Sequence, residues 1–174
     1  MSDRFAHHLK LDRIHDGDRL ELVADDEERR AIAERFGLVS LDCLHAHATL
    51  SRKGAVIEAE GRIVAALNQN CAVTGEPVPA HVDEPFRLVF MPEPDVRRSE
   101  EEVELGPNDC DVVFYEGGSI DLGAAIADTL ALNLDPYPRS AAAAAALKEA
   151  GVLSEDEAGP FAALAKLRKG SEAS

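Results

Sequence analysis

The chain has 174 residues, enough for a domain that buries its own hydrophobic core without disulfide or metal support. Acidic residues number 33 and basic residues 18, so the net charge is −15. Nucleic-acid affinity comes mainly from Lys and Arg side chains that neutralise phosphates, so this balance disfavours broad contact with a phosphate backbone and favours a basic protein partner. The three cysteines are sparse, the first ten residues lack an apolar leader, and no apolar run reaches the roughly 20 residues of a membrane span. We therefore expect a cytoplasmic protein.

The N-terminal part predicts two short strands and a helix. Residues 5–23 alternate loosely around Gly17, which is typical of a strand, a turn and a second strand. Either Asp25 or Asp26 can cap the helix that follows, and glutamates fill its first turn, where the helix dipole favours negative charge. Gly37 is placed to end this helix.

A change to period-two alternation over residues 39–90 predicts three or four antiparallel strands. Lys53-Gly54 marks one turn between them, and residues 74–77 (Thr-Gly-Glu-Pro) mark another. Residues 111–115 predict a further strand that returns to the sheet. The expected fold class is α+β, with an antiparallel β-sheet or partly open barrel flanked by short helices.

The remaining segments are an acidic loop and a helical C-terminal part. Residues 83–121 carry 12 acidic and 3 basic side chains, and the Pro-rich stretch 91–109 predicts an exposed acidic loop. Asp121 is placed to cap a helix that must end before Asp135, because prolines follow. We expect helical structure over about 120–170, within a single domain spanning residues 1–174.

No short enzyme signature is present, such as a nucleophile elbow, a phosphate-binding loop or a zinc-protease motif. This favours a non-catalytic protein. Cys43, His45 and His47 alternate along one predicted strand face, and His81 or Cys71 would be needed to complete a metal site. A metal-binding module or metal-dependent enzyme built on these side chains is an alternative, although one strand does not easily supply tetrahedral geometry.

Four sequence blocks, taken in order and spacing, resemble the YceD/DUF177 family of ribosomal-RNA accumulation proteins. The two more specific ones are residues 61–78 and residues 120–136; the flanking ones are residues 28–38 and residues 160–164. The resemblance implies a bacterial cytosolic factor needed for the accumulation of large-subunit ribosomal RNA, without known catalytic activity. Many members carry a C-x-x-C pair in the second block and another cysteine pair after the Pro-rich turn, which implies a metal-binding arrangement.

This chain departs from both cysteine pairs. Thr74 stands three residues after Cys71, and an alanine run follows Ser140. One thiolate does not hold a structural zinc ion, which normally takes four ligands, so we predict neither a bound metal nor any other cofactor.

The resulting hypothesis is a non-catalytic factor that binds a basic ribosomal protein or assembly factor and affects ribosomal RNA indirectly. The predicted protein-contact residues lie in the hairpin 70–78 and the acidic loop: Asn70, Cys71, Thr74, Glu76, Pro77, Glu100, Glu101, Glu102 and Glu104. The alternative of a direct RNA-binding module would use the basic C-terminal tip of Lys166, Arg168 and Lys169. A purely structural interaction domain unrelated to ribosomes is a third possibility.

Overall fold

The computed structural model describes residue 5, residues 7–93 and residues 111–152. These residues form two compact units. The first unit comprises the described residues of 1–69 and 79–136, and the second comprises 70–78 with the described residues from 137 onward. The prediction of a single domain over residues 1–174 stays a prediction.

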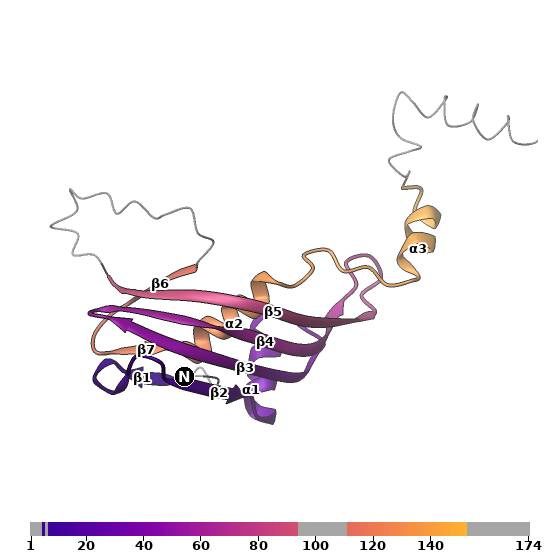
Figure 1. Ribbon diagram of the computed structural model, residues 1–174. Coiled ribbons are helices and arrows are strands. Elements are labelled where there is room, and N and C mark those ends of the chain that lie inside the picture. Colours follow the sequence, from indigo (N-terminus) through magenta and orange to yellow (C-terminus); the bar gives the residue numbers. More distant parts are fainter. Residues whose placement is uncertain (1–4, 6, 94–110, 153–174) are drawn as a thin grey trace, which may run out of the picture. The chain divides into compact units, whose positions relative to one another are not determined.

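The first unit is built on a five-stranded sheet with the strand order β2-β3-β4-β5-β6 (Figure 1). Its strands are β2 (Arg19–Val23), β3 (Ser40–Lys53), β4 (Val56–Asn70), β5 (Pro77–Pro92) and β6 (Asp111–Tyr115). Side chains alternate between buried and exposed along β3 and β4, and this is the period-two pattern seen in the sequence. Gly54, with φ +66°, forms the turn between these two strands.

The predicted α+β fold with an open sheet and short helices is confirmed. In one respect the sheet differs from the antiparallel prediction. β6 pairs with β5 in parallel, with Leu88 opposite Asp111 and Pro92 opposite Tyr115. A parallel neighbour needs a long crossover connection, and the 18 residues between the ends of these strands provide one. The predicted acidic loop 91–109 starts inside β5, and residues 94–110 lie outside the described residues.

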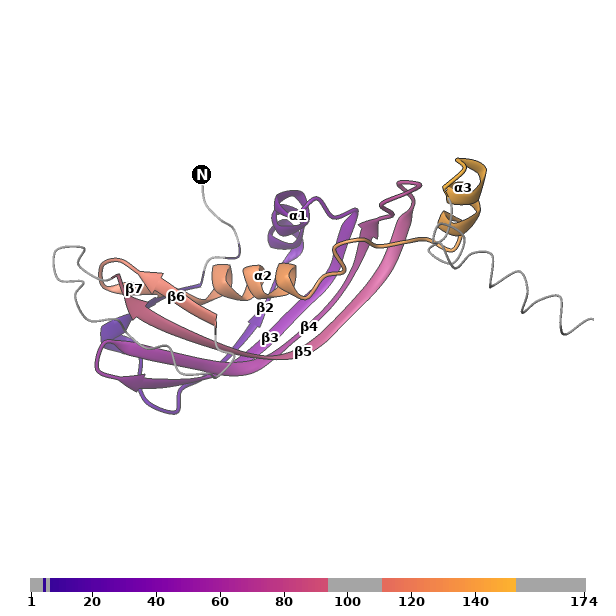
Figure 2. The same ribbon diagram turned by 90° about the horizontal axis from the view of Figure 1, so that it is seen from above.

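Helices α1 (Asp26–Arg35) and α2 (Leu122–Leu132) lie on the same face of the sheet (Figures 1 and 2). α2 is the more deeply buried helix, and its Leu122, Ile126 and Leu130 are inaccessible to solvent. They join the inward side chains of β3 to β5, such as Leu44 and Phe90, in one core. The opposite face of the sheet, here called the outer face, carries the exposed side chains of each strand.

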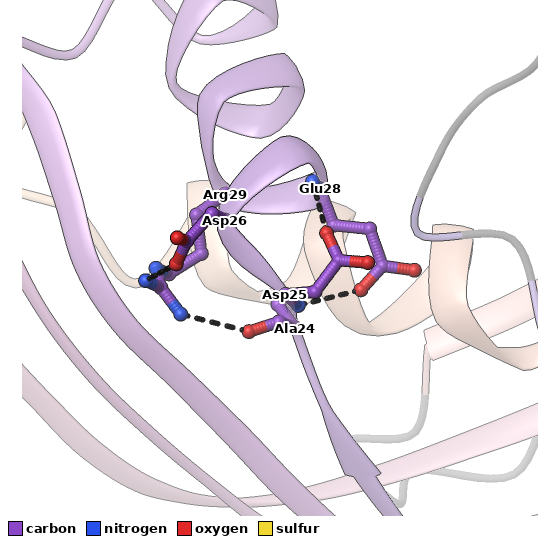
Figure 3. Close-up of polar contacts among 5 residues, drawn as sticks. All are labelled: Ala24, Asp25, Asp26, Glu28 and Arg29. Carbon is purple, nitrogen blue, oxygen red and sulfur yellow. Dashed lines mark hydrogen bonds and ion pairs between the residues drawn. The ribbon is translucent and has the colours of Figure 1, made fainter.

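The start of α1 confirms the predicted cap (Figure 3). The Asp25 side chain accepts a hydrogen bond from the Glu28 backbone amide at 2.9 Å, and the Glu28 side chain accepts one from the Asp25 amide at 2.7 Å. This reciprocal capping box satisfies two amides that have no partner inside the helix. Gly37, with φ +64°, follows the last turn as expected.

A second, two-stranded sheet pairs β1 (His8–Lys10) with β7 (Ser119–Asp121), and a 3-10 helix at Leu11–Arg13 follows β1. Asp121 joins this sheet to α2, because its carboxylate accepts hydrogen bonds from the amides of His7 and Ala124, both at 3.0 Å. The second unit contains the turn between β4 and β5 and helix α3 (Ala143–Glu149). None of the helices in the described part of the chain is long and apolar enough to span a membrane.

Candidate functional site

The second unit gathers four polar side chains from two distant segments, here called the Cys71 cluster: Cys71, Thr74, Glu76 and Ser140. The first three come from the turn between β4 and β5, where Gly75, with φ +74°, reverses the chain. Ser140 comes from the segment before α3. A backbone hydrogen bond from Ala72 to the Pro138 carbonyl at 2.8 Å ties the two segments together.

The Cys71 thiol is the buried centre of this cluster, with 4 % of the residue exposed. Its Sγ accepts hydrogen bonds from the backbone amides of Ser140, at 3.2 Å, and Thr74, at 3.4 Å. These hydrogen bonds, that of Ser140 first, lower the pKa of Cys71 to about 6, because N–H donors stabilise the thiolate. The backbone amides of Ser140 and Thr74 therefore favour the thiolate form of this side chain.

The Glu76 carboxylate connects the two hydroxyl groups of the cluster. The hydroxyls of Thr74 and Ser140 both donate to its Oε2, at 3.0 and 2.9 Å, and their oxygen atoms lie 3.2 Å apart. The Cys71 backbone amide donates to the Glu76 carbonyl at 2.8 Å, which closes the turn. The cluster is therefore a hydrogen-bonded staple between the hairpin and the residues before α3.

The predicted contact residues of the hairpin divide by exposure. Asn70, Glu76 and Pro77 are exposed, Thr74 is half-buried and Cys71 points inward. Only the first three therefore offer much surface to a partner. Ser140 was not among the predicted site residues, because nothing in the local sequence shows a contact across 69 positions.

The donor set of the Cys71 cluster does not fit the metal that the resemblance implies. Three positions of the expected cysteines, Cys71, Thr74 and Ser140, meet in space, but they supply one thiolate and two hydroxyls, and Glu76 adds a carboxylate. Structural zinc sites normally use four thiolate or imidazole ligands. Here the backbone amides of Thr74 and Ser140 donate to Cys71 Sγ, and the Glu76 carboxylate accepts from the two hydroxyls. Hydrogen bonds therefore join the hairpin to the segment before α3.

The alternative metal site lies on the outer face of β3. His45 and His47 are exposed there, opposite Val64 and Arg62 of β4, and Cys43 is half-buried opposite Ala66. Within the described residues, no three His, Cys, Asp or Glu side chains are arranged to hold a metal ion. The metal-binding alternative therefore gains no support from this strand.

A groove of about 530 Å³ in the first unit runs between α1 and the start of β3. Ala33, Leu38 and Val39 are among the residues that line it. Asp26, Arg29, Arg30 and Glu34 are its charged lining residues, and the Arg29 guanidinium pairs with Asp26 and donates to the Ala24 carbonyl (Figure 3).

The other predicted contact residues lie outside the described residues. These are Glu100, Glu101, Glu102 and Glu104 of the acidic loop, and Lys166, Arg168 and Lys169 of the C-terminal tip. Their assignments to protein and RNA contact stay predictions.

Comparison with curated proteins and with solved structures gave no match. A protein-family model does match, and its description is "Large ribosomal RNA subunit accumulation protein YceD". The match covers residues 59–168, which include most of β4, the Cys71 cluster and helices α2 and α3. The match includes three of the four blocks that carry the resemblance. Because it covers more than half of the chain, the protein belongs to the YceD family, whose description implies a part in the accumulation of large-subunit ribosomal RNA.

Proposed function

We propose that this protein is a non-catalytic cytoplasmic factor that supports large-subunit ribosomal RNA accumulation by binding a basic ribosomal protein or assembly factor. Its effect on RNA is then indirect. Family membership supports the ribosomal setting, and the charge of −15 supports a basic partner.

The observation that carries the choice of a protein partner is the ion pairing on the outer sheet face. The Arg62 guanidinium contacts the Asp83 carboxylate at 2.5 Å and lowers its pKa. Arg87 pairs with Glu58 at 3.2 Å and with Glu60 at 3.1 Å. An RNA phosphate would have to displace a carboxylate from each of these cations, so the face offers little of the free positive charge that RNA binding needs.

The exposed part of the hairpin is the proposed contact surface in the second unit. Asn70, Glu76 and Pro77 are exposed there, and the Cys71 cluster fixes the backbone on which they stand. A surface on a fixed turn binds with a smaller loss of conformational entropy than a flexible one. The acidic residues 100–104 are proposed as a second contact for the same basic partner.

The test is an affinity pulldown of the tagged full chain from its own host's lysate, with and without nuclease, followed by mass spectrometry. We expect large-subunit ribosomal proteins or assembly factors to remain after nuclease treatment and to be released by salt. Substitution of Asn70 and Pro77 by alanine should reduce this capture, whereas the same change at the exposed, uncharged Thr49 and Pro85 should not. Loss of all ribosomal partners on nuclease treatment would show an RNA bridge and overturn the proposal.

A further inference from the structure

An apolar patch lies on the outer sheet face where β5 meets β6. Val89 stands opposite Val112 and Met91 opposite Phe114 in the parallel register. These side chains point away from the core, because the intervening Phe90 is buried with 1 % exposed. Phe114 is 58 % exposed, although an aromatic ring of this size normally buries most of its surface.

Two carboxylates adjoin this patch at the end of β5 and β6. The Glu93 amide donates to the Tyr115 carbonyl at 3.1 Å, which places Glu93 beside Glu116. The two side chains lie within hydrogen-bonding reach, and this contact raises the pKa of Glu93. Two carboxylates so close repel each other when both are ionised, and a nearby cation would relieve that repulsion.

β6 is also the last strand of its sheet. Among the described strands it pairs with β5 alone, so the main-chain groups of its other edge can receive a further strand. Proteins commonly protect such edges with lysine or proline, and neither occurs in Asp111–Tyr115. An edge strand with alternate side-chain pockets is the site used in recognition by strand addition.

We propose that the β6 edge, with its Phe114 patch and carboxylate rim, is a docking surface for an extended, Lys- or Arg-rich segment of another protein. The segment adds as a strand to β6. Its apolar side chains cover Phe114 and Met91, and its cations pair with Glu93 and Glu116. The identity of the natural partner rests on the proposed function, whereas the surface rests on the geometry of β5 and β6.

The opposite edge of the same sheet supplies a matched control. Val23 is the last residue of the edge strand β2, and it is 53 % exposed on the outer face. Its place resembles that of Phe114, which is the last residue but one of the edge strand β6. No pair of contacting carboxylates adjoins Val23 in the described residues. Val23→Ser therefore removes an exposed apolar side chain without altering the proposed surface. Glu21→Gln with Glu34→Gln removes two negative charges away from that surface, and it is the control for Glu93→Gln with Glu116→Gln.

The experiment titrates the isotopically labelled full chain with a short capped peptide of alternating lysine and valine, followed by NMR. We expect chemical-shift changes and slowed amide exchange within Asp111–Tyr115, and no response to the matching glutamate–valine peptide. Phe114→Ser should weaken binding about tenfold or more, as loss of an aromatic anchor does, and Val23→Ser should not. Glu93→Gln with Glu116→Gln should weaken binding and flatten its salt dependence, unlike the control pair. Thermal melting confirms that each variant is folded.

Three results would overturn the inference. One is binding of the peptide away from β6, or equal binding by the Phe114 and Val23 variants. Another is a dimer of the free protein, detected by sedimentation, that Phe114→Ser dissolves, because a second copy would then be the occupant. The third is displacement of the peptide by oligouridine at the same amides. If the peptide binds β6 but the lysate yields no ribosomal partner, only the proposed function fails; captured ribosomal proteins without peptide binding would reject this surface alone.

Discussion

Removal of the Glu76 carboxylate should loosen the second unit while leaving the first unit intact. The carboxylate oxygen Oε2 receives the hydroxyl groups of both Thr74 and Ser140, which come from segments far apart in the chain. Glu76→Ala deletes this acceptor. Glu76→Gln keeps an acceptor oxygen in nearly the same position, and it serves as the conservative variant.

The size of the effect follows from the exposure of the two hydrogen bonds. A hydrogen bond to a charged group stabilises a protein by about 1.5–3 kcal/mol when it is well shielded. Both hydrogen bonds of Glu76 are exposed, and water replaces them in the variant, so we expect about 0.5 kcal/mol each. The free energy of local opening should therefore fall by about 1 kcal/mol in Glu76→Ala, with about fivefold faster amide exchange. Glu76→Gln should lose less than half of this.

Native-state hydrogen exchange measures both units in one sample. The Ala72 and Gly75 amides report the second unit, because their acceptors are the carbonyls of Pro138 and Cys71. The Ala24 amide, bonded to the Leu44 carbonyl at 3.0 Å, reports the first unit. If Glu76→Ala accelerated all three amides equally, or none of them, the cluster would not be a staple of the second unit.

Three further predictions concern other features. Gly61→Ala should destabilise the first unit by about 2–3 kcal/mol or more in urea unfolding, because its Cβ would lie 1.8 Å from the His47 carbonyl oxygen; an unchanged midpoint would contradict this. The stabilisation linked to Cys71 should be complete above about pH 9 and lost as the pH falls to about 6, because the pKa of its thiol is lower in the folded than in the unfolded protein. Cys71→Ala should remove this pH dependence of the free energy of unfolding. A gain of stability on acidification would refute the prediction. Asp121→Ala deprives two backbone amides of their acceptor and should cost about 1–2 kcal/mol in thermal unfolding, with Asp121→Asn milder; an unaltered melting temperature for the alanine variant would count against the cap.

Local signals in the sequence were sufficient for most elements of the fold. Asp25 and Gly37 delimit α1 because capping and positive φ are properties of single residues and their neighbours. The long strands β3 and β4 are visible for the same reason, since alternation over many residues needs no knowledge of the partner. Strand β7 was missed, because three residues are too few to show a period.

Contacts between distant segments were not visible in the sequence. Residues 111–115 read correctly as a strand, but their parallel direction depends on the path of the crossover connection. The approach of Ser140 to Cys71 depends on where the chain runs after α2, and a serine beside an alanine run carries no local sign of it. The exposed Phe114 looked like an ordinary strand residue, because its position on an edge follows only from the strand order.

Neutralising acidic side chains distinguishes a basic protein partner from direct RNA contact, because it changes the two affinities in opposite directions. Both kinds of association weaken as salt rises, so salt dependence alone does not distinguish them. Neutralising Glu93 and Glu116 has opposite consequences in the two cases. It removes attraction to a lysine-rich partner, whereas it removes repulsion of phosphates from an RNA. The double glutamine variant should therefore bind basic ribosomal proteins more weakly in an affinity measurement; tighter binding to ribosomal RNA than the wild type shows would instead identify RNA as the direct ligand.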